Sequence, residues 1–146
     1  MNVTIVAVDK LRERYLRDGC ALYVKRLAPY AGISMAEVRK SSVAGEGRAI
    51  FVHLADGDVL WAVDGGGEML SSIDLAHRIS RVERSGTRRL VLAIGGPDGL
   101  DRAVIDRADF VWSLSPLTFL HEMARLIVLE QLYRAAKIAR DEPYHR

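Results

Sequence analysis

The chain has 146 residues, enough for one ordinary domain, and we expect residues 1–146 to form a single domain. Its composition is 49% hydrophobic and 27% charged, which excludes a disordered or fibrous chain. The formal net charge of +2 is too small to indicate nucleic-acid binding by itself. The sequence shows no apolar run of membrane-spanning length, no secretory signal and a single cysteine, so we expect a cytoplasmic protein without a membrane partner, disulfide or metal site.

The first half of the chain predicts strands and helices in alternation. β-branched residues over Asn2–Val8 indicate a buried strand, and apolar residues at helical spacing predict a helix over Arg12–Leu27. Alternation over Ile33–Val38 favours a second, less buried strand. The polar segment Arg39–Arg48 contains two glycines and predicts a mobile loop, followed by a short helix over Ala49–Ala55.

The same alternation continues to the end of the chain. Strands are expected at Val59–Val63, Arg89–Ile94 and Phe110–Leu114, and helices from Ser71 or Ser72 to Ser85, from Asp101 to Ala108 and from His121 to Ala139. Apolar strands without strict alternation are typical of a sheet that is buried on both faces. We therefore predict an α/β fold, with a single layered, mostly parallel sheet and helices on both faces.

Three loops follow predicted strands and are candidates for a binding site. They are Asp64–Gly67, Gly95–Gly99 and Ser115–Leu120. In open α/β sheets, ligands bind beyond the carboxyl ends of the strands, and glycine lets the backbone approach a ligand closely. A plain strand-to-helix turn explains a glycine loop equally well. The motifs GxGxxG and GxxxxGK[ST] are both absent, so neither a dinucleotide site nor a phosphate-binding P-loop is indicated.

Basic and apolar residues suggest two further surfaces. Arginines recur at three- and four-residue intervals in the helix after Ser72 and at its exit, and either a solvated face or RNA phosphate contact explains them. They are Arg78, Arg81, Arg84 and Arg88, and the basic residues Arg39, Lys40 and Arg48 extend the possible phosphate-contacting surface. The last helix is apolar over about half of its circumference, which favours core packing or a dimer interface, and Gln131 there needs a hydrogen-bonding partner.

Several ordered segments resemble the ribosomal RNA large subunit methyltransferase H family. They are Val6–Leu16 (VAVDKLRERYL), Gly95–Gly99 (GGPDG), Trp112–Phe119 (WSLSPLTF), His121 with Arg125, Glu130–Arg134 (EQLYR) and the terminal Pro143–Arg146 (PYHR). The resemblance covers essentially the whole chain. It implies a SPOUT-type methyltransferase whose C-terminal part is threaded as a trefoil knot and which acts as a homodimer.

The resemblance also implies a reaction and a cofactor. Family members use S-adenosylmethionine to methylate N3 of a pseudouridine in helix 69 of 23S ribosomal RNA, within the assembled 70S ribosome. No metal takes part. The cofactor contacts that the resemblance implies belong to the three strand-end loops, at Val63, Gly95, Leu114, Ser115, Pro116, Leu117, Thr118 and Phe119.

In the family, the C-terminal tail reaches toward the partner's cofactor site. By this resemblance His145 helps the N3 proton to leave or orients the base. Arg134 and Arg146 then position phosphate or uracil carbonyl groups, and Tyr144 stacks on a base.

Two positions depart from the pattern that is common in the family. Leu120 stands where a proline usually precedes the histidine, and Asp9 stands where a glycine is common, so Asp9 is expected to adopt a glycine-like backbone geometry. Two other interpretations remain open. In the first, the chain is a non-catalytic dimer that binds the ribosome or RNA. In the second, it is a SPOUT methyltransferase that acts on another RNA.

Overall fold

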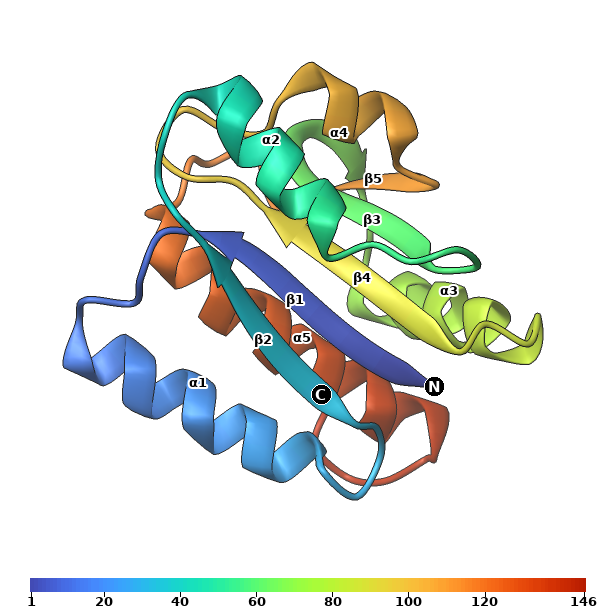
Figure 1. The fold of residues 1–146 in the computed structure, drawn as a ribbon. Coiled ribbons are helices and arrows are strands. Elements are labelled where there is room, and N and C mark those ends of the chain that lie inside the picture. The colour runs from blue at the N-terminus through green and yellow to red at the C-terminus, as the bar shows by residue number, and fades with distance from the viewer.

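The computed structural model describes the whole chain, from Met1 to Arg146. Its centre is a five-stranded sheet in the order β2-β1-β4-β3-β5, in which every neighbouring pair is parallel (Figure 1). The strands are β1 (Asn2–Val8), β2 (Ile33–Val38), β3 (Val59–Met69), β4 (Arg89–Ile94) and β5 (Phe110–Ser113). The helices are α1 (Arg14–Leu27), α2 (Val43–Val52), α3 (Ser72–Arg84), α4 (Arg102–Arg107) and α5 (His121–Ala139).

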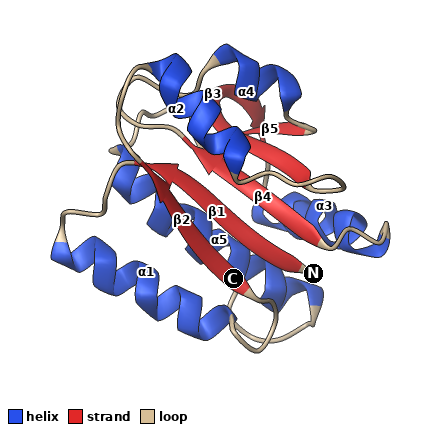
Figure 2. Cartoon of the chain, in the orientation of Figure 1, coloured by secondary structure: helices blue, strands red, loops and turns tan.

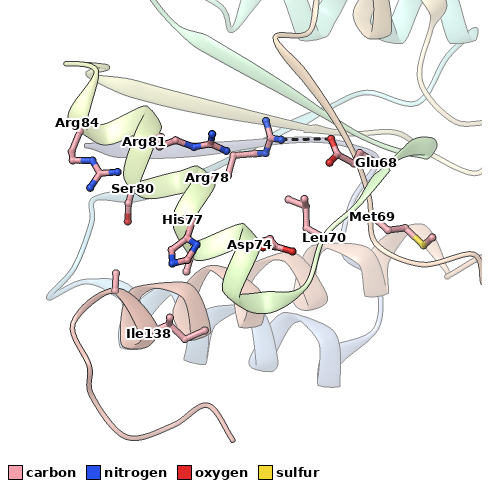
Figure 3. Close-up of a pocket in the computed structure, with 12 residues that line it drawn as sticks. Glu68, Met69, Leu70, Asp74, His77, Arg78, Ser80, Arg81, Arg84 and Ile138 are labelled. Carbon is pink, nitrogen blue, oxygen red and sulfur yellow. Dashed lines mark ion pairs between the residues drawn. The ribbon is translucent and has the colours of Figure 1, made fainter.

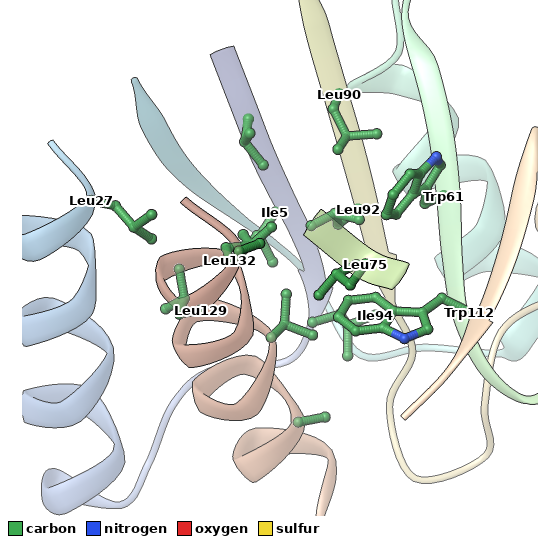
Figure 4. Packing of buried hydrophobic residues seen from close by; sticks show 14 of the residues in the cluster. Ile5, Leu27, Trp61, Leu75, Leu90, Leu92, Ile94, Trp112, Leu129 and Leu132 are labelled. Atoms are coloured by element: carbon green, nitrogen blue, oxygen red, sulfur yellow. The ribbon is translucent and has the colours of Figure 1, made fainter. Parts of the chain in front are cut away.

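Helices cover both faces of the sheet, which confirms the predicted α/β class (Figure 2). On one face, α1, α3 and α5 pack over strand residues such as Ile5 and Leu92, and Leu129 of α5 is fully buried against them (Figure 4). On the other face, Ile50 of α2 and Val104 of α4 are buried over the sheet. Each of these side chains stabilises the fold by about 1.5–3 kcal/mol relative to an exposed one. None of the helices combines the length and the apolar character that crossing a membrane requires.

Helix α5 lies between α1 and α3 and contacts both. The polar side chain on its apolar surface, Gln131, has the partner that burial requires. The hydroxyl of Ser72 donates to its Oε1 atom over 2.8 Å, and its Nε2 atom donates to a carboxylate oxygen of Glu130 over 2.8 Å.

One stretch differs from what the sequence predicted. The mobile loop expected over Arg39–Arg48 is wrong and the helix expected over Ala49–Ala55 has the wrong bounds, because α2 starts at Val43 and ends at Val52. The hydroxyl of Ser42 accepts a hydrogen bond of 3.0 Å from the backbone N–H of Gly45, which caps the helix. The glycines that indicated a loop therefore belong to a capped helix.

Strand β3 is also longer than the expected Val59–Val63. It continues to Met69 and so includes the segment predicted as the turn Asp64–Gly67. Trp112 of β5 pairs with both Val63 and Glu68, so the residues between these two leave the ladder and are accommodated as an irregularity. These residues, between Val63 and Glu68, lie at the edge of the sheet where the strands have their carboxyl ends.

Candidate active site

The three strand-end loops enclose one cavity of about 270 Å³ beside the first turn of α5. Its walls also include His121 and Ala124 of α5. All eight positions to which the family resemblance assigns cofactor contact line this cavity: Val63, Gly95, Leu114, Ser115, Pro116, Leu117, Thr118 and Phe119. Residues from β3, β4 and the segment after β5 therefore meet at one place, although they lie far apart in the sequence.

The glycine loop after β4 closes tightly against itself. The N–H of Gly99 donates to the carbonyl oxygen of Gly96 over 3.0 Å, and Gly99 has a φ of +79°. A Cβ atom added to Gly95 would lie 2.6 Å from the carbonyl carbon of Gly99, closer than real contacts allow. Glycine at position 95 is therefore required by packing against backbone, which cannot move aside as a flexible side chain can.

The cavity combines apolar walls with free backbone groups. Val63, Leu114 and Phe119 supply apolar surface. The backbone N–H groups of Gly95, Leu114 and Thr118 donate no hydrogen bond within the protein. Such a site suits a flat, largely apolar ligand with hydrogen-bonding edges.

A charged turn adjoins the cavity at the end of β1. Asp9 has a φ of +74°, as expected for a position where glycine is common. The N–H of Lys10 and the guanidinium of Arg12 donate to the Asp9 carboxylate over 2.9 Å each, and these bonds hold its pKa below the usual value, the Lys10 N–H having the largest effect. The Nε2 atom of His121, buried and without a hydrogen bond, lies 3.9 Å from the Asp9 Oδ2 atom.

Arg125 of α5 binds the backbone of the same turn, and its side chain is 1% exposed. Its guanidinium donates to the carbonyl oxygens of Val8 and Asp9 and, over 2.6 Å, to the carboxylate of Glu37. A buried guanidinium is costly unless it is paired in this way. The sequence marked Arg125 only as part of a family motif, and this role was not predicted. An arginine on the apolar surface of a helix is the signal that points to it.

The proposed catalytic residues of the tail gather at the other end of α5. Arg134 donates to the Nδ1 atom of His145 over 3.2 Å and to the carboxylate of Glu130 over 2.5 Å. Tyr144 donates to the same carboxylate over 3.0 Å, and the Arg134 guanidinium lies 4.8 Å from the centre of its ring. Arg146 is exposed and forms no ion pair. The structure thus brings three of the four proposed catalytic residues together, Arg134 of α5 with Tyr144 and His145 of the tail, beside Glu130, to which the sequence had assigned no role.

Neighbouring helices anchor this tail. The hydroxyl groups of Tyr144 and Tyr23 lie 3.2 Å apart, and burial, followed by the bonds to Tyr23 and Glu130, raises the pKa of Tyr144. Glu142 accepts hydrogen bonds from Tyr30 over 2.6 Å and from Lys137 over 2.7 Å, and the Lys137 ammonium group lowers the pKa of Glu142. The last residues are therefore positioned rather than frayed.

The tail and the cavity are at opposite ends of α5. His121 lies at the cavity and Arg134 near the tail, and a rise of 1.5 Å per residue places them about 20 Å apart along the helix. The C-terminus in Figure 1 lies near the amino ends of the strands, away from the arrowheads. The structure does not bring the tail to the cavity of its own chain.

A third feature is a basic cleft of about 820 Å³ along α3 (Figure 3). Arg78, Arg81 and Arg84 line it, whereas Arg88 does not. Arg78 is 3.5 Å from the carboxylate of Glu68 and lies over the Phe110 ring, 3.8 Å from its centre. Three of the four predicted arginines therefore line one cleft, and one of these three, Arg78, already forms an ion pair with a carboxylate of the protein.

Comparison with known proteins gives consistent matches. A family model described as "Predicted SPOUT methyltransferase" matches residues 1–145. The chain is 43% identical to the ribosomal RNA large subunit methyltransferase H of Carboxydothermus hydrogenoformans, with 100% of each chain covered. It is also 43% identical to that of Pelotomaculum thermopropionicum, with 99% of this chain and 98% of the other covered. A crystal structure from Bordetella pertussis Tohama I, titled "Probable Methyltransferase", shares the fold with a TM-score of 0.56 at 11% identity, over 92% of this chain and 96% of that one.

Proposed function

Because this chain belongs to the ribosomal RNA large subunit methyltransferase H family of SPOUT methyltransferases, we propose that it methylates large-subunit ribosomal RNA with S-adenosylmethionine as the methyl donor. The observation that carries the proposal is the meeting of three strand-end loops in one cavity, lined by all eight positions that match the family's cofactor site. A chain that only bound RNA would have no physical need for such a cavity.

The cavity fits an adenosine group. The unpaired backbone N–H groups of Gly95 and Leu114 can recognise hydrogen-bonding edges, and Val63 and Phe119 supply apolar surface for the ring. When bound, S-adenosylmethionine supplies a methyl group activated by its attachment to a sulfonium sulfur. The sulfur becomes a neutral thioether when the methyl group is transferred. The protein's remaining tasks are to hold the acceptor in line and to accommodate the proton that leaves it.

The proposed acceptor is N3 of a pseudouridine in helix 69 of 23S ribosomal RNA, in the assembled 70S ribosome. Forming the N3–methyl bond releases the N3 proton, and we assign to His145 the role of helping it leave or orienting the base. Arg134 and Arg146 position phosphate or carbonyl groups, and Tyr144 stacks on a base. In the present conformation the Arg134 guanidinium covers one face of the Tyr144 ring, so a stacked base takes the other face or displaces it.

The complete site requires two chains. The tail lies about 20 Å along α5 from the cavity of its own chain, so it serves the cavity of a second copy in the proposed homodimer. Apolar residues of α5 that are only half-buried in one chain, such as Ile127, have surface left for that contact. The trefoil knot stays a prediction of the resemblance, and the organisation of residues 1–146 as one domain stays a prediction from the length of the chain.

Methyl transfer from labelled S-adenosylmethionine to unmodified 70S ribosomes, free 50S subunits and transfer RNA tests the proposal. We expect label only with 70S ribosomes, and mass spectrometry should locate it on N3 of a helix 69 pseudouridine. Label on transfer RNA alone would instead identify a SPOUT enzyme with another target. Cofactor binding without label on any RNA would point to a different methyl acceptor, and failure to bind the cofactor would favour a non-catalytic ribosome-binding dimer.

A further inference from the structure

We propose that a second cavity, at the carboxyl ends of β1 and β2, is a binding site for the phosphate backbone of the substrate RNA. The inference rests on the proposed function. This groove has a volume of about 630 Å³ and is lined by four basic residues and two carboxylates. The basic residues are Lys10, Arg12, Arg39 and Lys40, and the carboxylates are Asp9 and Glu37.

Both carboxylates of the groove are already engaged by the protein. Asp9 accepts hydrogen bonds from the N–H of Lys10 and from the guanidinium of Arg12. Glu37 accepts one of 2.6 Å from the buried Arg125 and one of 3.1 Å from the N–H of Leu11. Their negative charge is thus largely neutralised by groups that hold the fold together.

The cations are left available. Lys10, Arg39 and Lys40 are exposed and pair with no carboxylate, and Arg12 keeps 65% of its side chain exposed despite its bond to Asp9. Three uncompensated cations around one concave surface produce a positive potential that attracts an anionic chain. Long basic side chains of this kind contact phosphate without reading the base sequence.

The groove lies next to the candidate cofactor cavity. Asp9 lines the groove and His121 lines the cavity, and the Oδ2 atom of one is 3.9 Å from the Nε2 atom of the other. A target base that approaches the methyl group of a cofactor held in the cavity has its flanking phosphates outside, at the rim. The groove places positive charge beside that rim, at the carboxyl ends of β1 and β2.

The larger cleft along α3 is less suited to this role on the same chain. Its arginines share the cleft with Glu68 and Asp74, and Arg78 is already paired with Glu68. The cleft also extends to Ile138 and Ala139, at the end of α5 that lies away from the cofactor cavity. It therefore provides a matched comparison: exposed basic residues at a different place on the same molecule.

The test replaces the three unpaired cations together, Lys10→Gln, Arg39→Gln and Lys40→Gln. Binding to vacant 70S ribosomes is measured by co-sedimentation over a range of salt concentrations, and methyl transfer is measured in parallel. We expect the apparent Kd and the KM for ribosomes to rise about tenfold or more, and the slope of log K against log salt to become shallower by about 2. The affinity for S-adenosylmethionine and the kcat should stay unchanged.

The control variant removes the same charge from α3 and its exit, Arg81→Gln, Arg84→Gln and Arg88→Gln, and should leave ribosome affinity unchanged. Exchanging the groove cations conservatively, Lys10→Arg, Arg39→Lys and Lys40→Arg, should restore binding. If the groove variant binds ribosomes with wild-type affinity and salt slope, or if only the α3 variant loses affinity, the groove is not the RNA site. If the wild-type chain methylates no RNA, the proposed function fails, whereas the co-sedimentation comparison still decides the groove.

Discussion

The guanidinium of Arg125 donates a hydrogen bond of 3.1 Å to the carbonyl oxygen of Val8, which ties the last helix to the end of the first strand. The bond adjoins the turn at Asp9, which lines the basic groove and whose carboxylate is 3.9 Å from His121 of the candidate cofactor cavity. A buried charge that bonds to backbone at this point makes the turn rigid, because moving it would leave the charge unpaired. The turn therefore gives the basic groove a fixed wall beside the candidate cofactor cavity.

The left-handed backbone of Asp9 predicts a specific order of stability among its variants. Asp9→Gly and Asp9→Ala both lose the bonds to Lys10 and Arg12, but only alanine adds steric strain at a φ of +74°. We expect the alanine variant to be less stable than the glycine variant by about 1–2 kcal/mol in urea unfolding. Equal midpoints for the two variants would mean that the turn relaxes to another conformation.

Gly95→Ala should damage the candidate cofactor cavity. Its Cβ would lie 2.6 Å from the carbonyl carbon of Gly99, so the loop must shift. We expect the free energy of unfolding to fall by about 1–3 kcal/mol and calorimetric affinity for S-adenosylmethionine to be lost. Gly65→Ala, whose Cβ would meet nothing within 4 Å, serves as the control for stability. Full cofactor affinity in the Gly95 variant would remove this loop from the site.

Deleting Tyr144–Arg146 should separate cofactor binding from catalysis. The tail is remote from the cavity of its own chain, so the deletion should leave the affinity for S-adenosylmethionine largely intact while methyl transfer to ribosomes is abolished. The single change His145→Ala should lower kcat by about 10²–10⁴ if the imidazole takes part in proton transfer. Tyr144→Phe keeps the ring and removes only its bonds to Glu130 and Tyr23. Unchanged turnover after the deletion would refute the tail's catalytic role.

Acid should destabilise the protein partly through Asp58. Its carboxylate accepts hydrogen bonds from Arg89, one of them over 3.1 Å, and these bonds hold the pKa of Asp58 below its usual value. A lowered folded-state pKa contributes stability that is fully present above the unfolded value of about 3.9 and is lost as pH falls through the folded value. Asp58→Asn should therefore be less stable at neutral pH and show a flatter loss of stability below about pH 4. The free energy of unfolding is measured by chemical denaturation at several pH values. If it fell equally steeply below about pH 4 in the variant and the wild type, this assignment would be contradicted.

Leu120→Pro should be tolerated and slightly stabilising. Leu120 precedes α5 with a φ of −54°, its N–H donates no hydrogen bond within the protein, and half of its surface is exposed. Proline fits this backbone geometry and restricts the unfolded chain, so the free energy of unfolding should rise by about 0.4–1 kcal/mol. A lower thermal midpoint would show that the residue before it cannot accept a following proline.

Local patterns in the sequence determined most of the fold. Apolar runs such as Arg89–Ile94 and the long helix over His121–Ala139 have the bounds that were predicted, because burial and helical periodicity are recorded in neighbouring residues. The start of α2 was missed because a serine cap and the packing of Gly47 against Asp101 outweigh the low helix propensity of glycine. The strand-end rule and the family resemblance also selected loops that meet in one cavity, the candidate cofactor cavity.

Only the tertiary structure decided which distant groups meet. Arg125 and Glu37 are far apart in the chain, and nothing local records that one neutralises the other beneath the Asp9 turn. The same holds for the groove, whose unpaired cations become recognisable only once the partners of its carboxylates are known. Periodicity reports which face of an element is buried, whereas charge pairing depends on which elements lie side by side, and that is settled by packing of the whole chain.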